Sequence, residues 1–152
     1  MSLSAQDKQL IQSSFAKVLP IADQAAEIFY AKLFSYDPSL KPLFKGDMKK
    51  QGQMLMSTIK VAVDGLDDLE TVAGVLQKLA HRHLDYGVKV EDYTPVGNAL
   101  IYTLQTGLGD DFTPQTKQAW VNVYKLIADV MRSAAYPDFD ANTFQNTKNY
   151  HH

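Results

Sequence analysis

Two histidines lie two positions apart in the middle of the chain, and their spacing decides which of them could do chemistry inside the protein. His81 and His83 fall in a segment whose apolar stripe includes Val72, Leu76 and Leu79. Residues two positions apart on a helix are separated by about 200° around its axis, so both imidazoles cannot face one metal ion. The stripe continues to His83, so we expect His83 to point inward and His81 to face water. A buried imidazole is a candidate metal ligand, although from position alone a core histidine bonded to a carbonyl group is the favoured interpretation.

Two further polar side chains lie on helix faces that the sequence predicts to be apolar. Gln51 precedes Leu55 by four residues on one face, and Tyr30 lies on the apolar face of its own segment. Each needs a hydrogen-bond partner when buried, which a ligand, a water molecule or a neighbouring group could supply. Taken alone, Gln51 is a half-exposed residue near a helix start and Tyr30 is a core tyrosine bonded to backbone. Phe44, just before a helix break, is by itself a core residue.

The composition leaves few other groups for catalysis or metal binding. The 152-residue chain has no cysteine, which excludes disulfides, thiolate metal sites, Fe–S clusters and a cysteine-linked cofactor. Two of its four histidines, His151 and His152, are the last two residues. Its three glutamates form no Glu-x-x-His pair, which disfavours a di-iron carboxylate bundle. No serine motif of a catalytic triad is present either.

Charge and hydropathy exclude several classes of partner. The formal net charge is -2 and the 15 Lys and Arg residues are scattered, so we do not expect a nucleic-acid partner. No stretch approaches the roughly 18 apolar residues of a membrane span. The N-terminal MSLSAQDKQL lacks the charged region and apolar stretch of a signal peptide. These features predict a cytoplasmic protein.

The patterned part of the chain has helical periodicity and no convincing strand alternation. We predict an all-α fold of about seven helices in one domain over residues 1–135, followed by a polar C-terminal tail over 136–152. Periodicity alone leaves open a bundle or a pack of crossed helices. The expected helices span residues 4–19, 21–36, 37–44, 48–64, 69–84, 92–108 and 114–135.

Three segments together resemble the globin family. FYAKLFSYDPSLKPLF (29–44) is similar to the second and third helices of bacterial single-domain globins and of the haem domain of flavohaemoglobins. KLAHRHLDYGVKVEDYTPVG (78–97) is similar to their proximal helix and the start of the next, and AWVNVYKLIADV (119–130) to their last helix. The resemblance covers roughly residues 5–135 and implies a globin fold around a haem pocket.

The resemblance also implies a role for particular residues on each side of the haem. Tyr30 and Gln51 fall on the distal pair that contacts a bound gas, and Leu55 would line the distal pocket one turn beyond Gln51. Gln53 competes with Gln51 for this role, but it lies about 200° away from the Leu55 face. Phe44 falls on the phenylalanine that wedges the haem in place.

On the proximal side, the resemblance makes His83 the iron ligand of a haem b that is held without covalent bonds. Tyr93 falls on a proximal tyrosine, and Arg82 lies where a basic side chain meets a haem propionate. There is one departure from the flavohaemoglobin pattern, because the glutamate of the last helix corresponds to Ala135. That carboxylate would push electron density onto the imidazole, so its absence argues against efficient oxygen activation.

The resemblance therefore implies reversible binding of O2, or of NO, CO or a similar small ligand, with tight O2 binding through Tyr30 and Gln51. The alternative is an NO dioxygenase, and because no flavin or nicotinamide domain follows within the 152 residues, a separate reductase would have to serve it. A third hypothesis is a haem-based gas or redox sensor, whose partner would dock on the tail after residue 136.

Overall fold

The computed structural model describes residues 3–44, 47–85 and 92–136, and within these ranges the protein is built from helices alone. There are six α-helices, and the short helix expected over 37–44 is a 3-10 helix, η2, over Pro38–Leu43. The all-α prediction is confirmed. The predicted tail lies outside the described residues apart from Tyr136. The α-helices are α1 (Ala5–Val18), α2 (Ala22–Tyr36), α3 (Met48–Asp64), α4 (Leu69–Asp85), α5 (Tyr93–Leu108) and α6 (Pro114–Ala135).

The helices begin where local side chains satisfy the first free backbone N–H groups. The Ser4 hydroxyl accepts a hydrogen bond of 3.0 Å from the Asp7 amide at the start of α1, and Thr113 does the same for Thr116 at 3.1 Å. Asp47 caps α3 through the Lys49 amide. Because a capping side chain replaces a lost intrahelical bond, these short polar residues fix the helix starts within the sequence itself.

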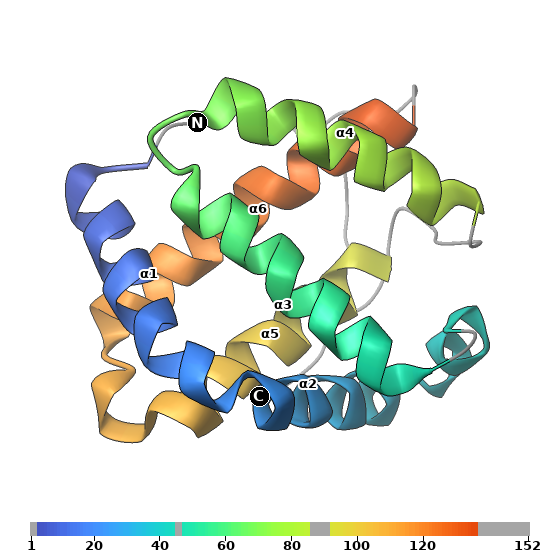
Figure 1. Cartoon of the computed structure of the whole chain (residues 1–152), viewed down its shortest axis with the longest axis horizontal. Helices are drawn as coiled ribbons and strands as arrows, with labels where there is room; N and C mark the ends of the chain where they lie inside the picture. Colours follow the sequence, from blue (N-terminus) through green and yellow to red (C-terminus); the bar gives the residue numbers. More distant parts are fainter. Residues whose placement is uncertain (1–2, 45–46, 86–91, 137–152) are drawn as a thin grey trace.

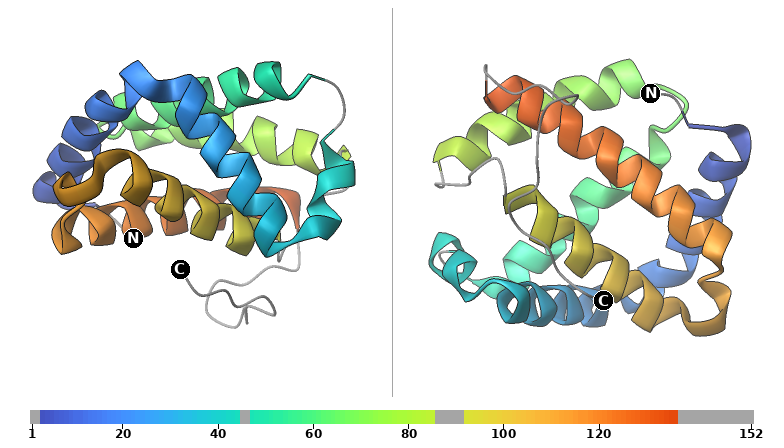
Figure 2. Two further views of the ribbon diagram at one scale, coloured as in Figure 1. Left: turned by 90° about the horizontal axis from the view of Figure 1, so that it is seen from below. Right: turned by 180° about the vertical axis from the view of Figure 1, so that it is seen from behind.

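The six helices cross one another in two layers (Figure 1). Both views agree that α3 and α4 lie on one side of the molecule, and α5 and α6 lie on the other (Figure 2). Helix α2 packs chiefly on α5, and α4 packs chiefly on α6. The layers therefore enclose a central space between α3 and α4 on one side and α5 and α6 on the other.

One end of this space is closed by a core around Trp120, which packs against Phe15 with ring centroids 6.2 Å apart. The Trp120 indole N–H donates to the Ser14 hydroxyl at 2.8 Å, so α6 is tied to α1 by a buried polar bond. A buried indole N–H needs such a partner. None of the helices in the described ranges is long and apolar enough to cross a membrane.

A close crossing holds α3 against α2. Gly52 is buried in α3, and a Cβ built on it would lie 2.8 Å from the Cβ of Ala26 in α2. Real side-chain carbons do not approach so closely, so the crossing requires a glycine at this position. It places the first turns of α3 directly beside Tyr30.

Candidate functional site

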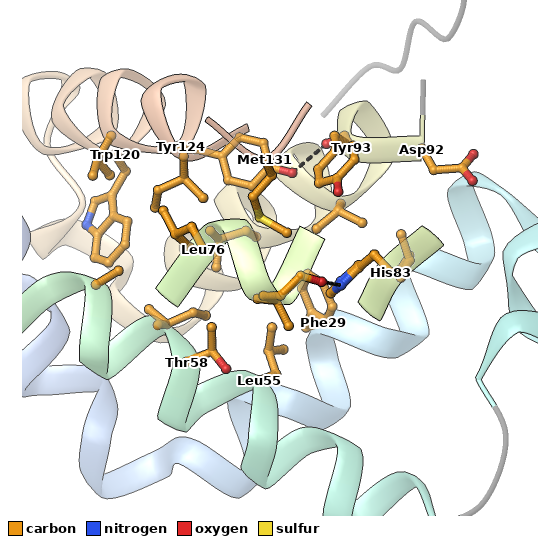
Figure 3. Close-up of a pocket in the computed structure, with 18 of the residues that line it drawn as sticks. Phe29, Leu55, Thr58, Leu76, His83, Asp92, Tyr93, Trp120, Tyr124 and Met131 are labelled. Carbon is orange, nitrogen blue, oxygen red and sulfur yellow. Dashed lines mark hydrogen bonds between the residues drawn. The ribbon is translucent and has the colours of Figure 1, made fainter. Parts of the chain in front are cut away.

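A large cavity lies between the two layers, and almost all of its wall is apolar. The empty space inside it, counted together with its open mouth, is about 1130 Å³. The polar atoms in the wall come from a few side chains only, chiefly Thr58, His83, Asp92 and the tyrosines Tyr93 and Tyr124. The ten lining residues labelled in Figure 3 come from five different helices and from the residue before α5. The cavity thus suits an apolar ligand that needs few polar contacts.

His83 reaches this cavity from the last turn of α4. Its Nδ1 lies 2.8 Å from the carbonyl oxygen of Leu79 (Figure 3). When Nδ1 donates to a carbonyl, the neutral imidazole keeps its acceptor lone pair on Nε2. Burial lowers the pKa of His83, and the charge of Arg82 lowers it further, while the bond to Leu79 opposes the shift. The neutral tautomer required of a metal-ligating histidine is therefore favoured.

The structure agrees with the helical-face prediction for the two histidines. His83 lies in the cavity wall, whereas His81 is exposed on the outer side of α4. Arg82 is also exposed, and it is not among the residues that line the cavity. Its proposed contact with a haem propionate stays a prediction.

Tyr93 lies beside His83 at the start of α5. Their rings are nearly parallel, with an interplanar angle of 22° and centroids 6.4 Å apart. The Tyr124 hydroxyl of α6 donates a hydrogen bond of 2.6 Å to the Tyr93 carbonyl oxygen. The hydroxyl of Tyr93 itself is buried without a hydrogen-bond partner among the described residues. Burial raises the pKa of Tyr93, so this hydroxyl stays protonated and can donate to a group placed in the cavity.

Two of the predicted pocket residues on the other side of the cavity, Leu55 and Phe44, lie in its wall. Leu55 comes from α3, and Phe44 follows η2. Phe44 packs edge-on against Tyr30 at a centroid distance of 5.3 Å and against Phe34 at 5.4 Å. This aromatic cluster fixes Phe44 at the edge of the cavity.

Tyr30 and Gln51 are adjacent, but neither belongs to the cavity wall among the described residues. The buried Tyr30 donates its hydroxyl to the backbone carbonyl oxygen of Gln51 at 3.2 Å, across the close crossing at Gly52. Gln51 is half-buried and Gln53 is exposed, so of the two glutamines Gln51 is the one turned toward the protein. Burial raises the pKa of Tyr30 to about 12, so its hydroxyl keeps its proton at neutral pH.

Sequence reasoning did not single out three features of the site. Phe29 lines the cavity next to Tyr30, and Asp92 is a buried residue at its edge whose carboxylate points outward in Figure 3. Arg132 is buried in α6 one turn before Ala135. The signal for Arg132 was available, because it lies on the same helix face as Ala128 and Ala135, which are both buried.

Comparisons with known proteins agree with this arrangement. The chain matches the family model described as Globin over residues 27–131. It is 32% identical over 132 residues to a flavohemoprotein of Halalkalibacterium halodurans, a match that covers 85% of this chain and 32% of that protein. It is 31% identical over 143 residues to the neuroglobin of Tetraodon nigroviridis, with 85% of this chain and 90% of the relative covered. Its structure is similar to that of a hexacoordinated haem protein from an anhydrobiotic tardigrade, with a TM-score of 0.81, 18% identity and coverage of 88% and 95%.

An all-α fold around a central apolar cavity with a histidine in its wall defines the class of protein, and the family match covers more than half of the chain. The chain belongs to the globin family. It is a haem-binding globin, and diatomic gases are the ligands that the family implies. Because the chain spans only 32% of the flavohemoprotein, the activity of that longer protein is not carried over with the fold.

Proposed function

We propose that this globin reversibly binds O2, or a similar diatomic gas, at a haem b held without covalent bonds in the central cavity, with His83 as the iron ligand. The observation that carries the proposal is the geometry of His83. Its imidazole, carried by α4, lies in the otherwise apolar wall of the cavity. Its Nδ1 lies 2.8 Å from the Leu79 carbonyl oxygen. That bond orients the ring and leaves Nε2 as the coordinating nitrogen.

The residues of the cavity fit a haem. Apolar side chains from α2 to α6 form a wall that would cover the macrocycle and exclude water. Phe44, after η2, and Leu55, in α3, also lie in the wall and would contact the macrocycle. The chain has no cysteine to form a thioether, so His83 and non-covalent contacts would retain the group. When bound, the haem would supply an iron able to accept a diatomic gas, with His83 holding that iron.

We assign the distal role to Tyr30 and Gln51. The Tyr30 ring lies one side chain behind the cavity wall, in contact with Phe29 and Phe44. To act on a bound gas, the Tyr30 hydroxyl would give up its hydrogen bond to the Gln51 carbonyl oxygen and donate to the ligand instead. The side-chain amide of Gln51 would donate to the same ligand from α3. Each such bond in a dry pocket contributes roughly 1–3 kcal/mol. Two donors would slow the release of O2, which suits scavenging more than bulk delivery.

The proposal is tested by adding haem to the apoprotein and following its Soret absorbance. We expect saturable binding by the parent and by His81→Gly, whose altered side chain is exposed. His83→Gly should lose the spectrum of a histidine-ligated haem and regain it when free imidazole is added. Binding spectra of His83→Gly that equal those of the parent without imidazole would overturn the assignment of His83.

A second candidate is an NO dioxygenase, which joins NO and O2 to give nitrate and consumes one electron per turnover from a separate reductase. The observation that favours it is Tyr93 lying against His83, which fits the proximal tyrosine of the bacterial globins and flavohaemoglobin haem domains that the chain resembles. Ala135 weighs against fast turnover, because no carboxylate stands there to strengthen the donation from the imidazole. Catalytic NO consumption with a generic reductase would establish this activity. Without such consumption, gas binding would be the function that remains.

A further inference from the structure

A buried positive charge lies on the His83 side of the cavity. Arg132 is only 7% exposed, although it carries a guanidinium group that is costly to remove from water. Its Nη2 donates to the Thr94 hydroxyl at 3.4 Å. The guanidinium carbon lies 5.4 Å from the centre of the Tyr93 ring, within range of a cation–π contact. These two contacts therefore keep the guanidinium of Arg132 beside the first turn of α5.

Tyr93 connects this charge to the histidine. One side of the tyrosine faces Arg132, and its ring lies nearly parallel to that of His83 at 6.4 Å. The Tyr124 bond to the Tyr93 backbone fixes the start of α5 between them. Arg132 of α6 and His83 of α4 thus both contact the ring of Tyr93 in α5, and His83 is the imidazole proposed to hold the iron.

We propose that Arg132 is a positioning residue that places a fixed positive charge on the Tyr93 side of His83 and thereby favours the ferrous form of a haem in the cavity. This rests on the proposed function, because it takes His83 as the iron ligand. The reduced form carries one electron more than the oxidised form, so a nearby cation stabilises it. A carboxylate at position 135 would act in the opposite direction, since it strengthens imidazole donation and favours ferric iron. A cation at Arg132 and a carboxylate at position 135 would therefore shift the balance of ferric and ferrous iron in opposite directions.

The expected size of the effect follows from Coulomb's law. The 5.4 Å and 6.4 Å contacts put the Arg132 charge at most about 12 Å from the imidazole. A unit charge about 12 Å away at an effective dielectric constant of about 20 changes a one-electron equilibrium by about tenfold. A tenfold change corresponds to 59 mV for a one-electron couple. The same charge exposed on the protein surface is screened by water and salt and has a much smaller effect.

The test is the reduction potential of the haem-loaded protein, measured by spectroelectrochemistry. Arg132→Gln and Arg132→Met remove the charge, and we expect both to shift the ferric-to-ferrous ratio about tenfold toward ferric iron. Arg132→Lys keeps a charge and should stay within about threefold of the parent. Lys125→Gln removes an exposed charge from the same helix and should leave the potential unchanged. A purely structural Arg132 would give equal shifts for the charged and neutral variants, and that result, or no shift at all, would overturn the proposal.

Two further measurements keep the test decisive. If the neutral variants do not fold, Ala135→Glu is measured instead, because it adds the opposite charge one turn along the same helix face. A lower reduction potential, with a similar change in the ratio of ferric to ferrous iron, supports the proposed electrostatics. An unchanged potential refutes the proposal. Failure of the proposed function gives a different result. In that case the parent protein shows no haem spectrum that depends on His83, and this is known before any potential is measured.

Discussion

The hydroxyl of Tyr124 donates a hydrogen bond of 2.6 Å to the backbone carbonyl oxygen of Tyr93. Tyr93 is the first residue of α5, so the bond fixes that end of the helix against α6. Gly97 makes room for it, because a Cβ there would lie only 2.5 Å from the Tyr124 ring. The position of Tyr93 beside His83 therefore depends on a residue in another helix.

We expect Tyr124→Phe to lower the free energy of unfolding of the apoprotein by about 1–3 kcal/mol, because it leaves a carbonyl at the cavity edge without its donor. Urea unfolding measures this cost. The control is Tyr102→Phe, which removes a hydroxyl from a half-buried tyrosine outside the cavity wall. Equal losses for the two variants would show that the bond between Tyr124 and Tyr93 adds nothing.

Two glycines give opposite predictions for the same change to alanine. Gly52→Ala puts a methyl group 2.8 Å from the Ala26 Cβ, and neither helix backbone can yield without moving the crossing, so we expect a loss of about 1–3 kcal/mol. Gly74 is exposed inside α4, with nothing within 4 Å of an added Cβ. Gly74→Ala should therefore stabilise the protein by about 0.5–1 kcal/mol through helix propensity. Thermal unfolding of both variants checks the pair, and a stabilised Gly52→Ala variant would contradict the tight crossing.

The helix bounds and the choice between the two histidines could be predicted because they depend on local features. Ser4, Asp47 and Thr113 cap their helices within a few residues along the chain, so the sequence contains both the donor and the acceptor. The face of His83 follows from a 3.6-residue period applied to one helix. Neither argument requires knowledge of where another helix lies.

The hydrogen bond of Tyr30 could not be predicted in the same way. Its acceptor is the carbonyl of Gln51, and the two meet only because α2 and α3 cross at Gly52. The buried face of α6 that carries Arg132 follows from the spacing with Ala128 and Ala135, but the contacts of its guanidinium with Thr94 and Tyr93 depend on how α6 packs on α5. These contacts join distant parts of the chain, which periodicity does not describe.

Alkaline pH should destabilise the protein through Tyr30. Its pKa is raised from 10.0 to about 12 by burial, so the unfolded chain releases this proton first as the pH rises. The stabilising contribution is fully present below about pH 10 and is lost as the pH rises through about 12. The free energy of unfolding of the parent should therefore fall more steeply above about pH 10 than that of Tyr30→Phe. Parallel pH profiles for the two proteins would show that Tyr30 ionises normally.

The rate of O2 release tests the distal assignment directly. If Tyr30 donates to bound O2, Tyr30→Phe removes a bond worth roughly 1–3 kcal/mol, and O2 should dissociate at least about fivefold faster in stopped-flow measurements. Tyr36→Phe is a matched control, because it removes a hydroxyl from the same helix at a position outside the cavity wall. Tyr36→Phe should release O2 at the parent rate. An unchanged rate in Tyr30→Phe would mean that its hydroxyl stays on the Gln51 carbonyl and that α3 alone supplies the distal contacts.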